Sequence, residues 1–229
     1  MIEFFPEGFE ESRESGDVVL TAFTDEAGAD RIRARFGEIV VEPVPDGWED
    51  EWKRFHRPVE IGALWVGPPW KEPRTGLMPV VIDPGRAFGT GAHPTTQLCL
   101  ELLLDLERGS LVDLGCGSGV VAIAAVRLGF SPVTAVDFDE AAIEATERNA
   151  EANGVDVEAR TTDLRTDPAP SAEVAVANID LRTIELLRPD SATVVTSGYS
   201  TVDHPHIPGF RRVERRVRAN WAADLFRRQ

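Results

Sequence analysis

The sequence predicts an α/β fold, in which the strands of a parallel sheet alternate with helices, on three observations. A short apolar run at residues 111–114 is followed by three glycines at alternate positions, Gly115, Gly117 and Gly119. An alanine-rich segment with helical spacing comes next. A second apolar run then ends in Asp137. Strand, glycine turn, helix, strand and acid together have the length of one right-handed βαβ unit.

The glycine turn and the acid predict a site for a nucleoside-containing cofactor. Glycines bring a ligand close to the main chain and to a helix N-terminus, and an acid at the end of the second strand accepts hydrogen bonds from ribose hydroxyls. The spacing is GxGxG, whereas dinucleotide-binding proteins have GxGxxG. Asp113 would repel a pyrophosphate but pair with a cationic amino group, which S-adenosylmethionine (SAM) has. The pattern therefore resembles the SAM site of Rossmann-like methyltransferases, with a dinucleotide enzyme or a non-binding relic as the alternatives.

Composition narrows the class of protein. The 229 residues suffice for one large domain, or for a main domain with a small appendage. A net charge of −15 argues against nonspecific binding to nucleic acid or to an anionic membrane and favours a basic partner. No apolar run is long enough to cross a bilayer and no signal peptide is present, so we expect a cytoplasmic protein. Cys99 and Cys116 have no metal-ligand spacing, and no metal is expected.

The first 57 residues predict a small α+β domain, followed by a linker at residues 58–78 and the main domain at residues 79–229. Within the small domain, β-prone runs and helical spacing predict strands at 2–5, 18–23 and 38–44 and helices at 27–36 and 46–55. Four prolines break regular structure in the linker, where a short strand is expected within 61–66. A layer of this size buries little surface by itself. We therefore expect it to pack against another surface or to serve as a docking surface.

The stretch PVVIDPGRAFGTGAHPTT at residues 79–96 is the second informative one. A strand at 80–82 runs into a loop that contains Gly85, Gly89 and Gly91. Thr95 or Thr96 is the expected cap of a helix at 97–105. A loop with this much glycine is unusual for a connector, and we expect it to cover a ligand in the neighbouring pocket.

The chain after Asp137 continues the α/β alternation. Helical spacing and apolar runs predict helices at 140–153 and 182–187, parallel strands at 155–159, 172–177 and 192–197, and a terminal antiparallel pair at 210–218 and 221–226. Asp163 follows a strand, which would put it at a carboxyl end beside the adenine ring. A turn aspartate is the alternative for that residue.

Taken together, these segments resemble the ribosomal protein L11 methyltransferase family. The most specific strings are IDPG at 82–85, AFGTG at 87–91 and HPTT at 93–96, and VDLGCGSG at 112–119, Asp137 and VAN at 176–178 follow in matching order. The resemblance covers roughly residues 48–198. It implies a Rossmann-like SAM-dependent methyltransferase domain behind a small ferredoxin-like substrate-recognition domain. We expect that domain to be truncated here, because the family's version normally begins with another strand and helix.

The resemblance also implies a function and a set of site residues. The chain would methylate protein amino groups, a lysine or an N-terminal amine, with ribosomal protein L11 as substrate. Lysines of another protein, a small molecule, or no substrate at all in a non-catalytic SAM-binding scaffold are the alternatives. The motifs together predict these cofactor-binding residues: Phe88, Gly89, Thr90, Thr96, Asp113, Gly115, Gly117, Gly119, Asp137, Asp163 and Asn178.

Asn178 is also the candidate catalytic residue, because its side-chain or backbone carbonyl would orient the attacking amine. A lysine amine has a pKa of about 10.4 in solution and must lose a proton before it attacks, and apolar burial lowers that pKa. Asp180 and His93 are candidates for taking up the proton, with a structural role as the alternative for each. An adenine N6 methyltransferase usually has an aromatic pair after the asparagine, where Ile179 and Asp180 stand here.

Overall fold

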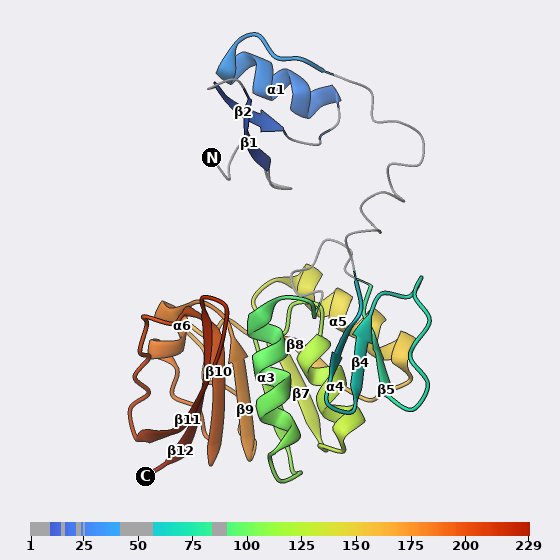
Figure 1. Ribbon diagram of the computed structural model, residues 1–229. Coiled ribbons are helices and arrows are strands. Elements are labelled where there is room, and N and C mark those ends of the chain that lie inside the picture. Colours follow the sequence, from blue (N-terminus) through green and yellow to red (C-terminus); the bar gives the residue numbers. More distant parts are fainter. Residues whose placement is uncertain (1–9, 15–16, 22–23, 25, 42–56, 84–90) are drawn as a thin grey trace. The chain divides into compact units, whose positions relative to one another are not determined.

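The computed structural model describes residues 10–14, 17–21, 24, 26–41, 57–83 and 91–229. The chain forms two compact units, Met1–Glu51 and Trp52–Gln229 (Figure 1). The expected strand at 2–5, the expected helix at 46–55 and residues 42–44 of the expected third strand lie outside the described residues. The division into residues 1–57, a linker and residues 79–229 stays a prediction.

The N-terminal unit contains an antiparallel pair and a helix. Strand β1 (Glu10–Glu14) pairs with β2 (Asp17–Thr21), and α1 (Glu26–Phe36) follows. The sequence predicted β2 and α1 but missed β1, whose sequence EESRE has no apolar alternation. Residues 38–41 are irregular although a strand was predicted from residue 38, and Val40 there is 87% exposed. The β-prone valines have no neighbouring strand in the described part of this unit, and propensity alone does not make a ladder.

The second unit begins with a three-stranded sheet. Strands β3 (Val59–Ile61) and β4 (Leu64–Gly67) pair antiparallel, and β4 pairs in parallel with β5 (Met78–Val81). These strands occupy residues predicted to be mostly linker. Every residue of β4 is buried, so the segment contributes to the core of the unit.

A seven-stranded sheet carries the rest of the unit, in the order β11-β12-β10-β9-β6-β7-β8 (Figure 1). Its parallel strands are β6 (Leu111–Leu114), β7 (Val133–Asp137), β8 (Glu158–Thr161), β9 (Val174–Asn178) and β10 (Thr193–Ser200). The chain runs outward from β6 through β7 to β8 and then returns to β9 on the other side of β6. Ligands bind at such a reversal, outside the carboxyl ends of the strands. The predicted α/β fold with a parallel sheet is confirmed.

Helices cover both faces of this sheet. Helices α3 (Pro94–Leu104), α4 (Val120–Leu128) and α5 (Glu140–Asn153) share one apolar core with the sheet and with the three-stranded sheet. Helix α6 (Leu181–Leu186) contributes Ile184 to a second core on the opposite face, together with Ile207 and Phe210. Alternate strand residues supply the two cores, which explains why the parallel strands are apolar throughout.

Several predicted element ends differ from the structure, among them those of α3, β8 and β10. Helix α3 begins at Pro94 with His93 as its cap, where Thr95 or Thr96 was predicted, because Pro suits the first helical position and the His93 side chain accepts from the Thr95 N–H. Strand β8 starts at Glu158 and not at residue 155, because Val155 still donates to the Ala150 carbonyl at the end of α5. Strand β10 continues past the predicted end at residue 197 to Ser200.

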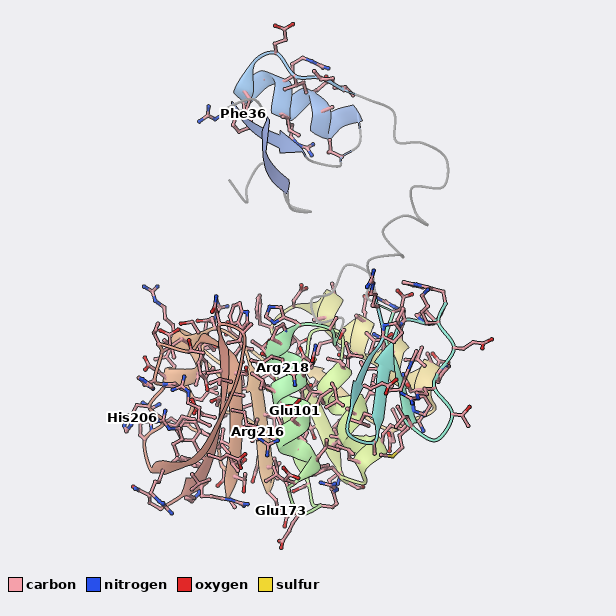
Figure 2. All side chains as sticks on the ribbon, in the orientation of Figure 1. Phe36, Glu101, Glu173, His206, Arg216 and Arg218 are labelled. Carbon is pink, nitrogen blue, oxygen red and sulfur yellow. The ribbon has the colours of Figure 1, made fainter. Side chains whose placement is uncertain are left out.

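The predicted terminal antiparallel pair is confirmed as β11 (Phe210–Arg218) and β12 (Trp221–Arg228). Two arginines of β11 join this edge of the sheet to α3. Arg216 pairs with Asp105 at 2.6 Å, and Arg218 pairs with Glu101, both of which Figure 2 labels. None of the helices in the described ranges combines the length and apolar character that crossing a bilayer requires.

Candidate functional site

The glycine turn between β6 and α4 forms the floor of the site. Gly115, Gly117 and Gly119 all have positive φ, at 84°, 54° and 79°. The Gly115 and Cys116 amides both donate to the Val136 carbonyl, at 2.8 and 3.0 Å, which fastens the turn to β7. A Cβ at Gly115 would lie 2.3 Å from a side-chain carbon of Ile179. Glycine is therefore required there both by backbone conformation and by the close approach of the β9 end.

Asp137 lies at the carboxyl end of β7 and faces the turn. Its Oδ2 accepts from the Gly117 N–H at 3.1 Å, and its Oδ1 accepts from the Asp139 N–H at 3.1 Å. The Asp139 side chain in turn caps α5. A carboxylate oxygen has more than one lone-pair site. Asp137 is therefore oriented by the backbone and keeps acceptor capacity for two hydroxyl groups.

Asp113 lies in β6 on the face covered by α4 and is only 2% exposed. Its Oδ2 accepts from the Ala122 N–H in the first turn of α4, at 3.1 Å. Burial raises the pKa of Asp113 to about 7; the Ala122 hydrogen bond opposes that shift and the charge of Asp137 adds to it. A cation beside this carboxyl group would favour its ionised form.

Asn178 and Thr96 meet at the carboxyl end of β9. The Asn178 Nδ2 donates to Thr96 Oγ1 at 3.2 Å, across 82 residues of sequence. Thr96 is buried in the first turn of α3. Because Thr96 engages the nitrogen of the carboxamide, the oxygen Oδ1 is the atom that an incoming N–H would use.

Gly198 is a site-forming residue that the sequence reasoning missed. It lies at a bulge in β10, has φ 103°, and a Cβ there would be 2.1 Å from the Ile179 carbonyl oxygen. The Ile179 N–H donates to the Ser197 carbonyl at 3.2 Å. Strand β10 therefore supports the turn that follows Asn178. The available signal was a glycine inside an otherwise apolar strand run, which indicates a bulge or a close backbone approach.

The remaining predicted site residues are engaged elsewhere or lie outside the described residues. Asp163 forms a two-pronged pair with Arg165, at 2.8 Å to both Nε and Nη2, and this hydrogen bonding lowers the pKa of Asp163 to about 2. The Arg165 guanidinium also lies 5.1 Å from the centre of the Phe138 ring. The place of Asp163 beside adenine stays a prediction. Phe88, Gly89 and Thr90 lie outside the described residues.

Both candidates for proton uptake are helix caps. Asp180 caps α6, accepting from the Thr183 N–H at 3.1 Å. His93 caps α3 and stacks edge-on against Trp221, with ring centres 4.9 Å apart. Burial lowers the pKa of His93, which favours the neutral ring. The structural role left open for each residue in the sequence is thus the one that these contacts support.

Comparison with known proteins gives consistent matches. The family model described as ribosomal protein L11 methyltransferase (PrmA) matches residues 10–202. The ribosomal protein L11 methyltransferase of Symbiobacterium thermophilum is 40% identical over 196 residues, which cover 81% of this chain and 64% of that protein. The enzyme of the same name from Shewanella sp. (strain ANA-3) is 44% identical over 164 residues, 69% of this chain and 56% of that protein. The chain thus spans less than two thirds of the length of these relatives.

A solved structure agrees with the fold. The crystal structure of ribosomal protein L11 methylase from Lactobacillus delbrueckii subsp. bulgaricus matches with a TM-score of 0.64 at 27% identity. The match covers 76% of this chain and 100% of that one. The predicted Rossmann-like methyltransferase fold is therefore confirmed.

Proposed function

We propose that this chain, which belongs to the ribosomal protein L11 methyltransferase family, transfers methyl groups from SAM to protein amino groups, with ribosomal protein L11 as substrate. The observation that carries the proposal is the contact between Asn178 and Thr96 beside the glycine turn. It presents a fixed carboxamide oxygen at the switch point of the sheet, where an amine can be aligned. The net charge of −15 supports a basic protein partner.

The residues of the candidate site suit SAM better than a phosphate-bearing nucleotide. Residues 111–119 contain no lysine, arginine or histidine, and the one carboxyl side chain in that run is that of Asp113. Asp137 keeps acceptor capacity for ribose hydroxyls, and the Gly115 backbone allows close approach. When bound, SAM supplies a methyl group on a positively charged sulfur, which is a good leaving group.

The chain's own contribution is alignment and exclusion of water. Asn178 Oδ1 would accept an N–H of the amine and hold its lone pair toward the pocket, while Thr96 keeps the carboxamide from rotating. Such alignment is worth several orders of magnitude in rate. The amine releases its proton to solvent before it attacks, and apolar surroundings in the site favour the neutral form. His93 and Asp180 cap helices and are not needed as bases in this scheme.

Asn178→Ala tests the proposal. We expect methyl transfer to fall about a hundredfold, because the amine loses its alignment, with a smaller change in SAM binding measured by calorimetry. Asn178→Asp keeps a side-chain oxygen that can accept a hydrogen bond from the amine but loses the N–H group that donates to Thr96. This variant therefore separates alignment of the amine from simple hydrogen-bond acceptance. Transfer that is unchanged in Asn178→Ala would remove the residue from the mechanism.

The substrate is tested separately, with tritium-labelled SAM. Labelling of purified ribosomal protein L11 supports the proposed substrate, and mass spectrometry of the product gives the modified amine. If a different protein of a cell lysate is labelled and L11 is not, the proposed substrate is wrong, but the proposed methyl transfer to a protein amine is still supported. SAM binding without any transfer would indicate a non-catalytic scaffold.

A further inference from the structure

Two buried asparagines on α5 hold the end of strand β5 and the residues that follow it. Asn153 Oδ1 accepts from the Val81 N–H at 2.9 Å, and its Nδ2 donates to the Val81 carbonyl at 2.6 Å. Asn149 Oδ1 accepts from the Asp83 N–H at 3.0 Å, and its Nδ2 lies 3.4 Å from the Asp83 carbonyl oxygen. The two side chains are 4% and 7% exposed, Asn149 being the more buried. The backbone of residues 81–83 is thus paired with side chains in the way an edge strand is paired with a neighbouring strand.

Helix and strand geometry explain why two asparagines suffice. Residues i and i+4 of a helix are separated by about 6 Å along its axis, at 1.5 Å per residue. Residues i and i+2 of a strand, whose hydrogen-bonding groups face the same edge, are separated by about 6.6 Å. Asn149 and Asn153 therefore match Asp83 and Val81, and α5 serves as the missing neighbour of that edge.

Asn149 makes one contact that Asn153 does not. Its Nδ2 also donates to the Ser118 carbonyl at 2.9 Å, and Ser118 is fully buried between Gly117 and Gly119. Asn153 instead donates to the Asn149 carbonyl, at 2.7 Å. The Asn149 side chain therefore joins the glycine turn to the Asp83 backbone, whereas the hydrogen bonds of the Asn153 side chain go only to Val81 and to its own helix.

We propose that Asn149 is a positioning residue for the cofactor site: it fixes the Ser118 carbonyl, and through it the glycine turn in its SAM-binding conformation. The inference rests on the proposed function. The Gly117 N–H of the same turn donates to Asp137, so a turn that relaxes also releases the ribose-binding acid. A turn that is not preorganised must be ordered at the moment of binding, which weakens affinity.

The test compares Asn149→Asp with Asn153→Asp. Each change removes the two amide donors, keeps an oxygen for the backbone N–H of residue 83 or 81, and adds one negative charge to the same face of α5. A buried carbonyl left without its donor costs about a factor of ten. We expect the Kd for SAM to rise about tenfold in Asn149→Asp and to stay within twofold in Asn153→Asp, although both variants lower the melting temperature of the free protein.

Kinetics give the readout that a purely structural role would not move. In Asn149→Asp, KM for SAM should rise while kcat at saturating SAM stays within about twofold. An equal rise of Kd in both variants, or no rise in Asn149→Asp, would overturn the inference while leaving the proposed function intact. A wild-type protein that binds no SAM would overturn the proposed function, and the inference with it.

Discussion

Replacing Asp113 with asparagine should stabilise the protein and weaken its binding of SAM. The Asp113 carboxyl group is 2% exposed and accepts a hydrogen bond from the Ala122 N–H. Asparagine keeps an oxygen for that donor and cannot ionise. The substitution therefore removes the cost of a buried charge at little cost in packing or hydrogen bonding.

The size of the effect follows from the pKa. Burial raises the pKa of Asp113 from 3.8 to about 7. This shift of about three units corresponds to at most about 4 kcal/mol at 1.36 kcal/mol per unit. The folded chain holds the proton more tightly than the unfolded chain, so the contribution of Asp113 to the free energy of unfolding falls as the pH rises from about 4 to about 7 and is constant above that. Asparagine does not titrate, so the advantage of the variant should grow across the same range.

Urea unfolding at pH 4.5, 6 and 8 measures this advantage, and calorimetry measures SAM binding at the same pH values. We expect the stability difference between Asp113→Asn and wild type to increase by a few kcal/mol from the lowest to the highest pH. Wild-type affinity for SAM should rise with pH through about 7, because the cationic ligand favours the ionised carboxylate, and the variant should bind weakly throughout. Asp156→Asn, at an exposed aspartate, controls for the loss of one charge. A stability difference that does not vary with pH would refute the reasoning.

Two further substitutions test the supports of the β9 end. Gly198→Ala should lower the free energy of unfolding by about 2 kcal/mol or more, because the new Cβ would clash with the Ile179 carbonyl oxygen. Gly76→Ala is the control, because Gly76 also has a positive φ, of 89°, but a Cβ there would meet no other atom within 4 Å. Equal urea midpoints in the two variants would contradict the clash. Thr96→Val should lower kcat about tenfold, because the Asn178 side chain loses its hydrogen-bond acceptor. Thr96→Ser keeps the hydroxyl group and should keep the wild-type rate. Equal rates in the two variants would show that this contact does not affect catalysis.

Local signals in the sequence were sufficient for the elements whose ends are marked by capping residues. Helix α5 has its predicted bounds because Asp139 caps its start and Gly154, with φ 61°, ends it. Strand β1 was missed because its stability comes from pairing with β2, which a charged sequence does not reveal. The start of α3 was misplaced because Thr is ordinarily a better cap than His, and Pro94 decided otherwise.

The site shows the same division between local and tertiary information. Asp137 and the glycine turn were predictable, since one βαβ unit contains both of them. The support of the Asn178 turn by Gly198 depends on a bulge between strands that are distant in sequence. Asp163 and Arg165 are only two residues apart, but the pattern of apolar residues that predicts a strand does not predict how an exposed arginine side chain is oriented. The role proposed for Asn149 could not be predicted from the sequence, because it depends on how α5, the glycine turn and the residues after β5 lie relative to one another.

The two acids of the candidate site have different surroundings, and this contrast distinguishes the cationic part of the ligand from its nucleoside. Both oxygens of Asp137 accept backbone hydrogen bonds, so the carboxyl group is oriented without a ligand. The buried Asp113 bears a desolvation cost that a bound ammonium group recovers and that a neutral nucleoside does not. Methylthioadenosine, which lacks the amino-acid end of SAM, should therefore bind with an affinity that does not change between pH 5 and pH 8. The affinity gap between SAM and methylthioadenosine should widen with pH in the wild type and stay constant in Asp113→Asn. A gap that widens equally in both proteins would assign the cation to another group.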